Sequence, residues 1–281
     1  MTPAVAVRTI DVMEPLPSLS DREFAQFQRF IYDSAGIALT EAKKLLVTGR
    51  LAARLRHYGM DSYGEYFRLL AGGQHPEEVQ MAIDLLTTNE TYFFREPNHF
   101  DFLRAQLQKL VRYAEPVRIW SAAGSTGEEA YSIAMCLEDC LCGRPWSVLA
   151  SDISVRVLAK ARAGHYPMER ARNIPLPYLQ RFCLRGQGKQ ENTLLVERGL
   201  RNKVQFQQVN LNASLPPLGL FDFVFLRNVL IYFNQETKRE VVGRVLRQLR
   251  PGGWLLISHT ESLYDVGVDV DQIAPSIFRK P

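Results

Sequence analysis

The feature of this sequence that most restricts its fold is the stretch from Val117 to Glu129, where an apolar run leads into a turn with two glycines. The run is typical of a buried strand, and Gly124 and Gly127 allow the tight backbone that brings a turn close to a ligand. The residues from Glu128 onward then begin a helical pattern. This order predicts an α/β fold with a mostly parallel sheet, which binds its ligand at this turn.

The same turn restricts the class of ligand. It lacks the full Gly-x-Gly-x-x-Gly pattern with which dinucleotide enzymes cradle a pyrophosphate. Glu128 and Glu129 would repel a phosphate at the helix start, although acidic residues are also ordinary stabilisers of a helix N-terminus. A cationic ligand without phosphate is better tolerated there. S-adenosylmethionine, which has a ribose and a sulfonium, fits that description.

Strands and helices alternate along the following chain. After a helix expected from Tyr131 to Leu141, an apolar run beginning at Ser147 ends in Asp152, where nucleotide-binding domains place the acid that holds ribose hydroxyls. Further strands are expected at 203–209, 221–226 and 254–258, with a helix at 236–249. Parallel strands end at one edge of a sheet, so polar side chains should converge there. These are Ser121, Asp152, Asn210, Arg227 and Asn228.

The chain before the glycine turn predicts helices only. Ser20 and Glu23 form a capping-box signature ahead of a first helical pattern. Three more helices are expected at 40–58, 62–70 and 75–86. We therefore predict an all-helical domain at residues 18–86, a linker at 87–115, which the resemblance described below implies to cover the cofactor, and an α/β domain at 116–281.

The segment from Ser154 to Asn202 is too long for an ordinary connection inside an α/β domain. It begins with a helical pattern at 155–164. Two short strands, Phe182–Arg185 and Thr193–Glu197, then flank a glycine-containing turn. We predict a small antiparallel sheet inserted at residues 171–202.

Charge is unevenly distributed along the chain. Residues 43–57 carry +5 and residues 170–203 carry +6; because the net charge is +4, the remainder carries −7. Such basic patches favour an acidic partner, for which nucleic acid, an anionic membrane surface and an acidic protein helix all qualify. Lys43, Arg50 and Arg54 share one face of the predicted helix, although a solvated helix surface explains such a stripe equally well.

Other features exclude several classes of protein. No apolar run approaches the ~18 to 20 residues of a membrane span, and the first 17 residues carry Arg8, Asp11 and Glu14 where a signal peptide has an apolar core. A cytoplasmic protein without membrane insertion is expected. The five histidines and four cysteines lack the spacing of metal ligands, so no metal is expected.

Four segments together resemble the CheR family of chemotaxis receptor methyltransferases, in that family's order and spacing. They are Thr87–Glu96, Ile119–Ser132, Ala150–Ile153 and Arg227–Phe233. The resemblance implies a Rossmann-like class I S-adenosylmethionine-dependent methyltransferase domain that follows an N-terminal helical domain. It also implies methyl transfer to glutamate side chains of chemoreceptors, with S-adenosylhomocysteine as the other product.

The resemblance further implies the site residues. The implied cofactor-binding residues are Asn89, Thr91, Arg95, Glu129, Asp152, Asn210, Leu211, Asn228 and Val229. Arg95 is also the candidate to orient the substrate carboxylate, because a guanidinium binds a carboxylate bidentately; an ordinary ion pair with Glu96 or Asp101 is the alternative. Tyr232 is the candidate to orient the acceptor oxygen, with core packing as the alternative.

Two partners are implied in the same way. One is the cytoplasmic helical bundle of a chemoreceptor, along whose acidic helices Lys43, Arg50 and Arg54 would dock. The other is a receptor's C-terminal peptide, which similar proteins bind at the inserted sheet and which would raise the effective concentration of substrate. Two other functions stay open: an RNA methyltransferase, which the basic patches suggest but no RNA-binding module supports, and a regulator that binds the cofactor without turnover.

Overall fold

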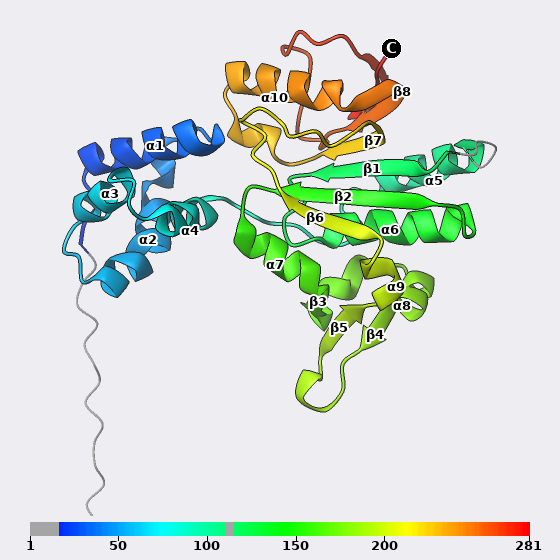
Figure 1. Cartoon of the computed structure of the whole chain (residues 1–281), viewed down its shortest axis with the longest axis horizontal. Coiled ribbons are helices and arrows are strands. Elements are labelled where there is room, and N and C mark those ends of the chain that lie inside the picture. The colour runs from blue at the N-terminus through cyan, green and yellow to red at the C-terminus, as the bar shows by residue number, and fades with distance from the viewer. Residues whose placement is uncertain (1–16, 111–114) are drawn as a thin grey trace, which may run out of the picture.

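The computed structural model describes residues 17–110 and 115–281, so the expectation that residues 1–16 contain no signal peptide lies outside the described residues. Figure 1 shows a group of helices on one side of a large twisted sheet, with a small second sheet below it. Within the described ranges, no helix combines the length and the apolar character needed to cross a membrane.

The N-terminal helices form a domain with its own hydrophobic core. They are α1 (Asp21–Ala35), α2 (Lys44–Tyr58), α3 (Tyr63–Ala71) and α4 (Pro76–Leu86), and a 3₁₀ helix, Glu41–Lys43, precedes α2. The predicted capping box is confirmed, because the Ser20 hydroxyl accepts from the amide of Glu23 while the Glu23 carboxylate accepts from the amide of Ser20. Phe27 and Val47 lie in the core with no exposed surface.

One carboxylate is buried in this helical domain. Glu78 on α4 is 3% exposed and receives two hydrogen bonds from the Arg54 guanidinium, at 2.7 and 2.5 Å. The hydroxyls of Tyr58 and Tyr66 donate to it as well, at 3.1 and 2.6 Å. Burial alone would raise the pKa of the Glu78 carboxyl, but these hydrogen bonds lower it, so the carboxylate stays ionised at neutral pH.

We expect Glu78→Gln to lower the free energy of unfolding by about 3 kcal/mol, because it leaves the Arg54 guanidinium without its counter-ion. Urea denaturation measures the change. The matched control is Glu77→Gln, which alters an exposed neighbour on the same helix and should change stability by less than about 0.5 kcal/mol. Equal effects of the two substitutions would contradict a stabilising role for the buried pair.

The large sheet has seven strands in the order β6-β2-β1-β7-β8-β10-β9. The strands are β1 (Val117–Ala122), β2 (Trp146–Asp152), β6 (Val204–Gln208), β7 (Phe221–Leu226), β8 (Leu249–Leu256), β9 (Asp271–Ala274) and β10 (Ile277–Arg279). The first five are parallel, and β10 is antiparallel to β8 and β9. The strand order reverses at β1, which is where a doubly wound sheet opens a crevice for a ligand.

Helices cover both faces of this sheet, as Figure 1 shows. They are α5 (Pro97–Leu110), α6 (Glu128–Leu141), α7 (Val155–Ala163) and α10 (Gln235–Arg247). Alternate residues of β1 serve different cores: Ile119 packs with α5 and α6, whereas Trp120 packs with α10. The predicted α/β fold is therefore confirmed.

Two details of the predicted sheet were wrong. The strand predicted at 254–258 begins earlier, at Leu249, so Arg250–Gly253 belongs to β8, whose pairing with β7 shifts register between Phe221 and Phe223. The preceding helix accordingly ends at Arg247 instead of Leu249. The C-terminal pair of β9 and β10 was not predicted, because β9 is short, largely exposed and has no alternating apolar pattern.

The expected insertion contains a three-stranded antiparallel sheet in the order β3-β5-β4. Its strands are β3 (His165–Pro167), β4 (Cys183–Arg185) and β5 (Thr193–Val196), accompanied by α8 (Leu176–Phe182) and α9 (Arg198–Arg201). The sheet thus begins before residue 171. Tyr166 and Val196 join the same core as α6, which attaches the insertion firmly to the large sheet.

The helical domain meets the α/β domain through the residues that follow α1. Ile37 forms a β-bridge with Phe233, and the amide of Ala38 donates to the carbonyl of Tyr232 at 2.8 Å. Gly36 has a φ of +72°, and a Cβ at this position would lie 2.7 Å from the Thr237 side chain. Only glycine therefore allows the two domains to approach so closely here.

Candidate functional site

The main pocket lies where the strand order reverses, between the large sheet and the helical domain. It is lined by all nine predicted cofactor residues, Asn89, Thr91, Arg95, Glu129, Asp152, Asn210, Leu211, Asn228 and Val229, and by Tyr232. Ala35 and Ile37 contribute a wall from the helical domain. Asp152, Asn210 and Asn228 thus meet at the carboxyl ends of the strands, as the sheet topology predicted, and the linker residues Asn89, Thr91 and Arg95 line the same pocket.

The turn after β1 keeps its backbone close to this pocket. Ala123, Ser125 and Gly127 have φ values of 62°, 50° and 94°, a left-handed conformation that most residues avoid. A Cβ on Gly124 would lie 2.7 Å from the Ser121 hydroxyl oxygen, so a side chain at this position does not fit without a shift. The strained turn leaves an open cradle against β1, as a ligand-binding turn requires.

Asp152 ends β2 and is 5% exposed. Its Oδ2 accepts from the amide of Ser125 at 3.0 Å and its Oδ1 accepts from the amide of Ser154 at 2.9 Å. The backbone therefore supplies donors that the sequence analysis assigned to cofactor hydroxyls alone, but each carboxylate oxygen can still accept a further bond. Burial raises the pKa of Asp152 to about 6, although the two amide hydrogen bonds oppose that shift.

We expect the affinity for S-adenosylhomocysteine to fall as the pH is lowered through about 6, by up to about tenfold per pH unit. The reason is that ribose hydroxyls donate to the ionised carboxylate, and this form is lost below the raised pKa of Asp152. Calorimetric titrations between pH 7.5 and 5 measure the effect. In Asp152→Asn the dependence should flatten, and an unchanged pH profile in that variant would contradict the assignment.

Glu129 lies in the first turn of α6 and lines the same pocket, with 13% of its side chain exposed. Its Oε1 accepts from the Ser121 hydroxyl at 2.6 Å, and its Oε2 lies 3.5 Å from Nη1 of Arg227. Burial raises the pKa of Glu129, and the Arg227 charge opposes that shift. Two carboxylates, those of Glu129 and Asp152, in a pocket that also has apolar lining fit S-adenosylmethionine, which presents an ammonium group and ribose hydroxyls.

Arg95 lies at the linker side of the pocket. Its guanidinium donates to the carbonyl of Glu90 at 3.0 Å and lies 5.5 Å from the ring centre of Tyr92. Neither Glu96 nor Asp101 forms an ion pair with it in the part of the chain that the structure describes; Glu96 instead pairs with Arg227 and Asp101 with Arg104. The guanidinium therefore keeps donors available for an anionic ligand.

Tyr232 ends the 3₁₀ helix Leu230–Tyr232 that follows β7, and it lines the pocket. Burial raises the pKa of its hydroxyl, although hydrogen bonding by Thr88 opposes that shift. The hydroxyl therefore remains protonated at neutral pH and can donate to an acceptor oxygen.

The predicted asparagines already have protein partners. The Asn210 amide donates to the carbonyl of Ser34 at 2.7 Å, which connects the two domains, and its Oδ1 accepts from the amide of Asn212. The Asn228 amide donates to the Ser258 hydroxyl at 2.6 Å. Any contact of Asn210 with a ligand thus involves its backbone more readily than its side chain.

The predicted basic stripe on α2 is only partly exposed. Lys43 is exposed, but Val47 on the same face is fully buried. Arg50 donates to the carbonyls of Leu86 and Thr87, and Arg54 pairs with Glu78, as described above. The two arginines anchor the helix to α4 and the linker, which leaves Lys43 as the member of the set that is free to meet a partner.

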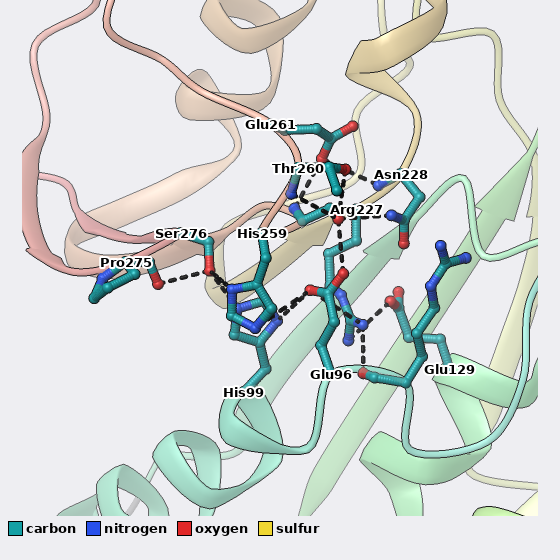
Figure 2. Close-up of polar contacts among 12 residues, drawn as sticks. Glu96, His99, Glu129, Arg227, Asn228, His259, Thr260, Glu261, Pro275 and Ser276 are labelled. Carbon is teal, nitrogen blue, oxygen red and sulfur yellow. Dashed lines mark hydrogen bonds and ion pairs between the residues drawn. The ribbon is translucent and has the colours of Figure 1, made fainter.

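Sequence reasoning missed the role of two charged residues at the pocket, the buried Arg227 and the half-buried Glu261. Figure 2 shows Arg227 beside Glu96 and Glu129, and Glu261 beside Asn228. The Glu261 carboxylate accepts from the backbone amides of Asn228, Leu230 and Ile231, which fixes the turn after β7. One sequence signal could have indicated the burial of Arg227. It directly follows the apolar end of a predicted strand, and a charged residue at that position is held close to the buried sheet.

Comparison with known proteins supports the family to which the motifs point. Two family models match: "CheR methyltransferase, all-alpha domain" over residues 22–87 and "CheR methyltransferase, SAM binding domain" over residues 89–275. The chemotaxis protein methyltransferase of Escherichia coli K12 is 44% identical over 87% of this chain and 86% of its own length. Chemotaxis protein methyltransferase 2 of Pseudomonas aeruginosa is 39% identical over 91% and 92%.

Among solved structures, the glycopeptide N-methyltransferase MtfA, complexed with S-adenosylmethionine, is 17% identical over 55% of this chain and 48% of its own, with a TM-score of 0.33. That similarity is too low to support an argument about the site. The two family models and the relatives cover both domains, and on that basis the chain belongs to the CheR methyltransferase family, with an S-adenosylmethionine-binding domain behind an all-α domain.

Proposed function

We propose that this protein transfers a methyl group from S-adenosylmethionine to glutamate side chains in the cytoplasmic helical bundle of chemoreceptors, producing glutamate methyl esters. The observation that carries the proposal is the pocket itself, in which two carboxylates suited to the cofactor lie beside a guanidinium and a tyrosine hydroxyl suited to an anionic acceptor. The names of the relatives, chemotaxis protein methyltransferases, support a receptor as the substrate.

The chemistry requires alignment more than acid or base catalysis. A glutamate side chain with a pKa near ~4.3 is already ionised at neutral pH, so it attacks without a general base. The bound cofactor supplies an activated methyl group on a sulfonium. The acceptor oxygen forms a bond to the methyl carbon while the carbon–sulfur bond breaks and its electron pair stays on sulfur. Near-attack alignment of this kind contributes roughly 7 to 11 kcal/mol.

Individual residues are assigned as follows in this proposal. Asp152 accepts hydrogen bonds from the ribose hydroxyls and Glu129 binds the cofactor's ammonium group. Arg95 holds the acceptor carboxylate, and Tyr232 donates a hydrogen bond to the acceptor oxygen that does not react. The remaining pocket residues, Asn89, Thr91, Asn210, Leu211, Asn228 and Val229, enclose the cofactor and exclude water.

Two surfaces outside the pocket belong to the same proposal. Lys43, directly before α2, contacts an acidic receptor helix. Arg50 and Arg54 hold α2 itself in place through their bonds to Leu86 and Glu78. The small sheet has β4 at one edge, and Leu184 on this strand is 55% exposed. A receptor's C-terminal peptide adds a strand at such an edge readily, because the unpaired backbone groups provide a template.

The test is transfer of labelled methyl from S-adenosylmethionine to membranes that contain chemoreceptors, followed by mild alkali. Label on receptor protein that alkali releases as methanol is the expected result, because methyl esters are base-labile. Receptors shortened at the C-terminus, assayed in parallel, should be labelled more slowly if the tether operates.

Two other results would replace the proposal. Alkali-stable label on bulk tRNA, offered in the same assay, would identify an RNA methyltransferase. Absence of label despite measurable binding of S-adenosylhomocysteine would favour a regulator that binds the cofactor without turnover.

A further inference from the structure

The backbone on both sides of Arg95 is strained. Phe94 and Glu96 have φ values of 53° and 58°, in the left-handed region that non-glycine residues rarely occupy. Such conformations persist only where the surroundings hold them in place. The amide of Phe94 donates to the Ser132 hydroxyl at 3.0 Å, which fixes one side of the turn to α6. The rest of the turn, from Arg95 to Glu96, must be held by the contacts that the Arg95 backbone and the Glu96 side chain make with other segments.

Arg227 supplies those contacts. It follows β7 directly, and its side chain is 1% exposed. Its Nη2 donates to the carbonyl of Arg95 and lies 3.6 Å from Oε2 of Glu96, while its Nη1 lies 3.5 Å from Oε2 of Glu129 (Figure 2). One rigid guanidinium therefore contacts both the turn that carries Arg95 and the carboxylate assigned to the cofactor.

Glu96 is held from its other side as well. Its Oε1 accepts from the Ser258 hydroxyl at 2.7 Å, and its Oε2 lies 3.4 Å from Nδ1 of His99 and 4.0 Å from Nε2 of His259. Burial, together with the Arg227 charge, lowers the pKa of His99 to about 3, so this imidazole is neutral at pH 7. Arg227 is therefore the fully buried cation that balances the carboxylates of Glu96 and Glu129.

We propose that Arg227 is a positioning residue for methyl transfer, which fixes the Arg95 turn relative to Glu129 through one buried guanidinium. The inference rests on the roles proposed above for Arg95 and Glu129. The planar fork of an arginine suits this task, because its fixed geometry combines one hydrogen bond, to the carbonyl of Arg95, with charge contacts to Glu96 and Glu129. A lysine keeps the charge but cannot make the same set of contacts.

A metal site is the competing explanation for part of this cluster. Among residues 17–110 and 115–281, Glu96, His99 and His259 form the group whose ligand atoms lie close enough for one ion, within 4.8 Å of one another. However, a metal ion there would lie beside the Arg227 guanidinium, which already approaches the same Glu96 oxygen, and two cations so close repel each other. The geometry favours the arginine as the counter-ion.

The experiment compares Arg227→Gln and Arg227→Lys with Arg250→Gln as a matched control. Arg250 is a partly buried arginine that also pairs with two carboxylates, Asp222 at 2.8 Å and Glu115 at 3.3 Å, but it lies at the opposite end of β7 from the pocket. Each variant is tested for thermal unfolding, for calorimetric binding of S-adenosylhomocysteine between pH 7.5 and 5, and for the kcat and KM of receptor methylation.

For Arg227→Gln we expect about tenfold weaker cofactor binding and a kcat lowered by about 100-fold, because misplacing an aligning group by about 1 Å costs roughly that factor. Loss of the cation also raises the pKa of Glu129 further, so the loss of affinity on acidification should begin at a higher pH than in the wild type. Arg227→Lys should recover part of both the affinity and the kcat. Arg250→Gln should lower the stability but leave the cofactor affinity and the kcat unchanged.

The inference would be overturned if Arg227→Gln had the same cofactor affinity, pH profile and kcat as the wild type. Where that variant does not fold, the same result in Arg227→Lys would overturn it. It would also be overturned by stoichiometric zinc in the purified wild type together with loss of cofactor binding on chelation, which would assign the cluster to a metal. Cofactor binding needs no receptor. A wild type that binds S-adenosylhomocysteine but labels no receptor would therefore contradict the proposed function, while the binding measurements still test Arg227.

Discussion

Replacing Asp152 with alanine is expected to weaken binding of S-adenosylhomocysteine by about 100-fold or more. Two hydrogen bonds from ribose hydroxyls to a buried carboxylate contribute roughly 1.5 to 3 kcal/mol each. The substitution also removes the acceptor for the amides of Ser125 and Ser154, so the strained turn after β1 loses one of its anchors. Isothermal titration calorimetry at pH 7.5 measures the affinity directly.

The control for this prediction is Asp152→Asn, which keeps the volume of the side chain and one acceptor oxygen. It should bind the cofactor product with intermediate affinity. Thermal unfolding of both variants separates loss of the turn from loss of the ligand contact. An unchanged affinity in Asp152→Ala would remove this residue from the cofactor site.

Replacing Arg95 with alanine is expected to lower the rate of methyl transfer by about 100-fold or more while weakening cofactor binding less than about tenfold. The reason is that its guanidinium is assigned to the acceptor carboxylate, whose alignment carries most of the catalysis. The contact with Arg227 uses the backbone carbonyl of Arg95, so removing the side chain leaves that contact intact. Single-turnover methylation and calorimetry, performed on the same preparation, separate the two effects.

Arg95→Lys provides the comparison, because it keeps the charge and loses the bidentate geometry. It should restore part of the rate. If the alanine variant instead loses cofactor affinity and rate to the same extent, Arg95 is a cofactor ligand only. The acceptor carboxylate would then need another partner in the pocket.

The sequence predicted the central sheet well because its strands contain continuous apolar runs, such as Phe223–Leu226, that are followed by a polar residue. A strand of this kind is buried whatever its neighbours are, and its end defines the edge where ligands bind. The same reasoning could not find β9, because an exposed edge strand has no apolar signature. It also began the strand near the C-terminus at Trp254 instead of Leu249, because the irregular pairing that accommodates proline and glycine in a strand depends on the partner strand.

The candidate site was likewise predictable only in part. Motif order placed Glu129 at a helix start and Asp152 at a strand end, and both line the pocket. Helical spacing predicted that Lys43 and Arg54 share a face, but spacing does not tell which way that face points, and Glu78, which pairs with Arg54, lies on another helix. The burial of Arg227 likewise depends on contacts between distant segments.

The wall that the helical domain contributes to the pocket has a thermodynamic consequence. Because Ile37 lines the pocket and also bridges to Phe233, a bound cofactor stabilises the docked arrangement of the two domains over any separated one. Linkage is reciprocal, so whatever favours docking must raise the affinity for the cofactor by the same factor. A receptor that contacts both domains at once would therefore act as more than a substrate: by holding the domains together, it would increase the enzyme's saturation with methyl donor.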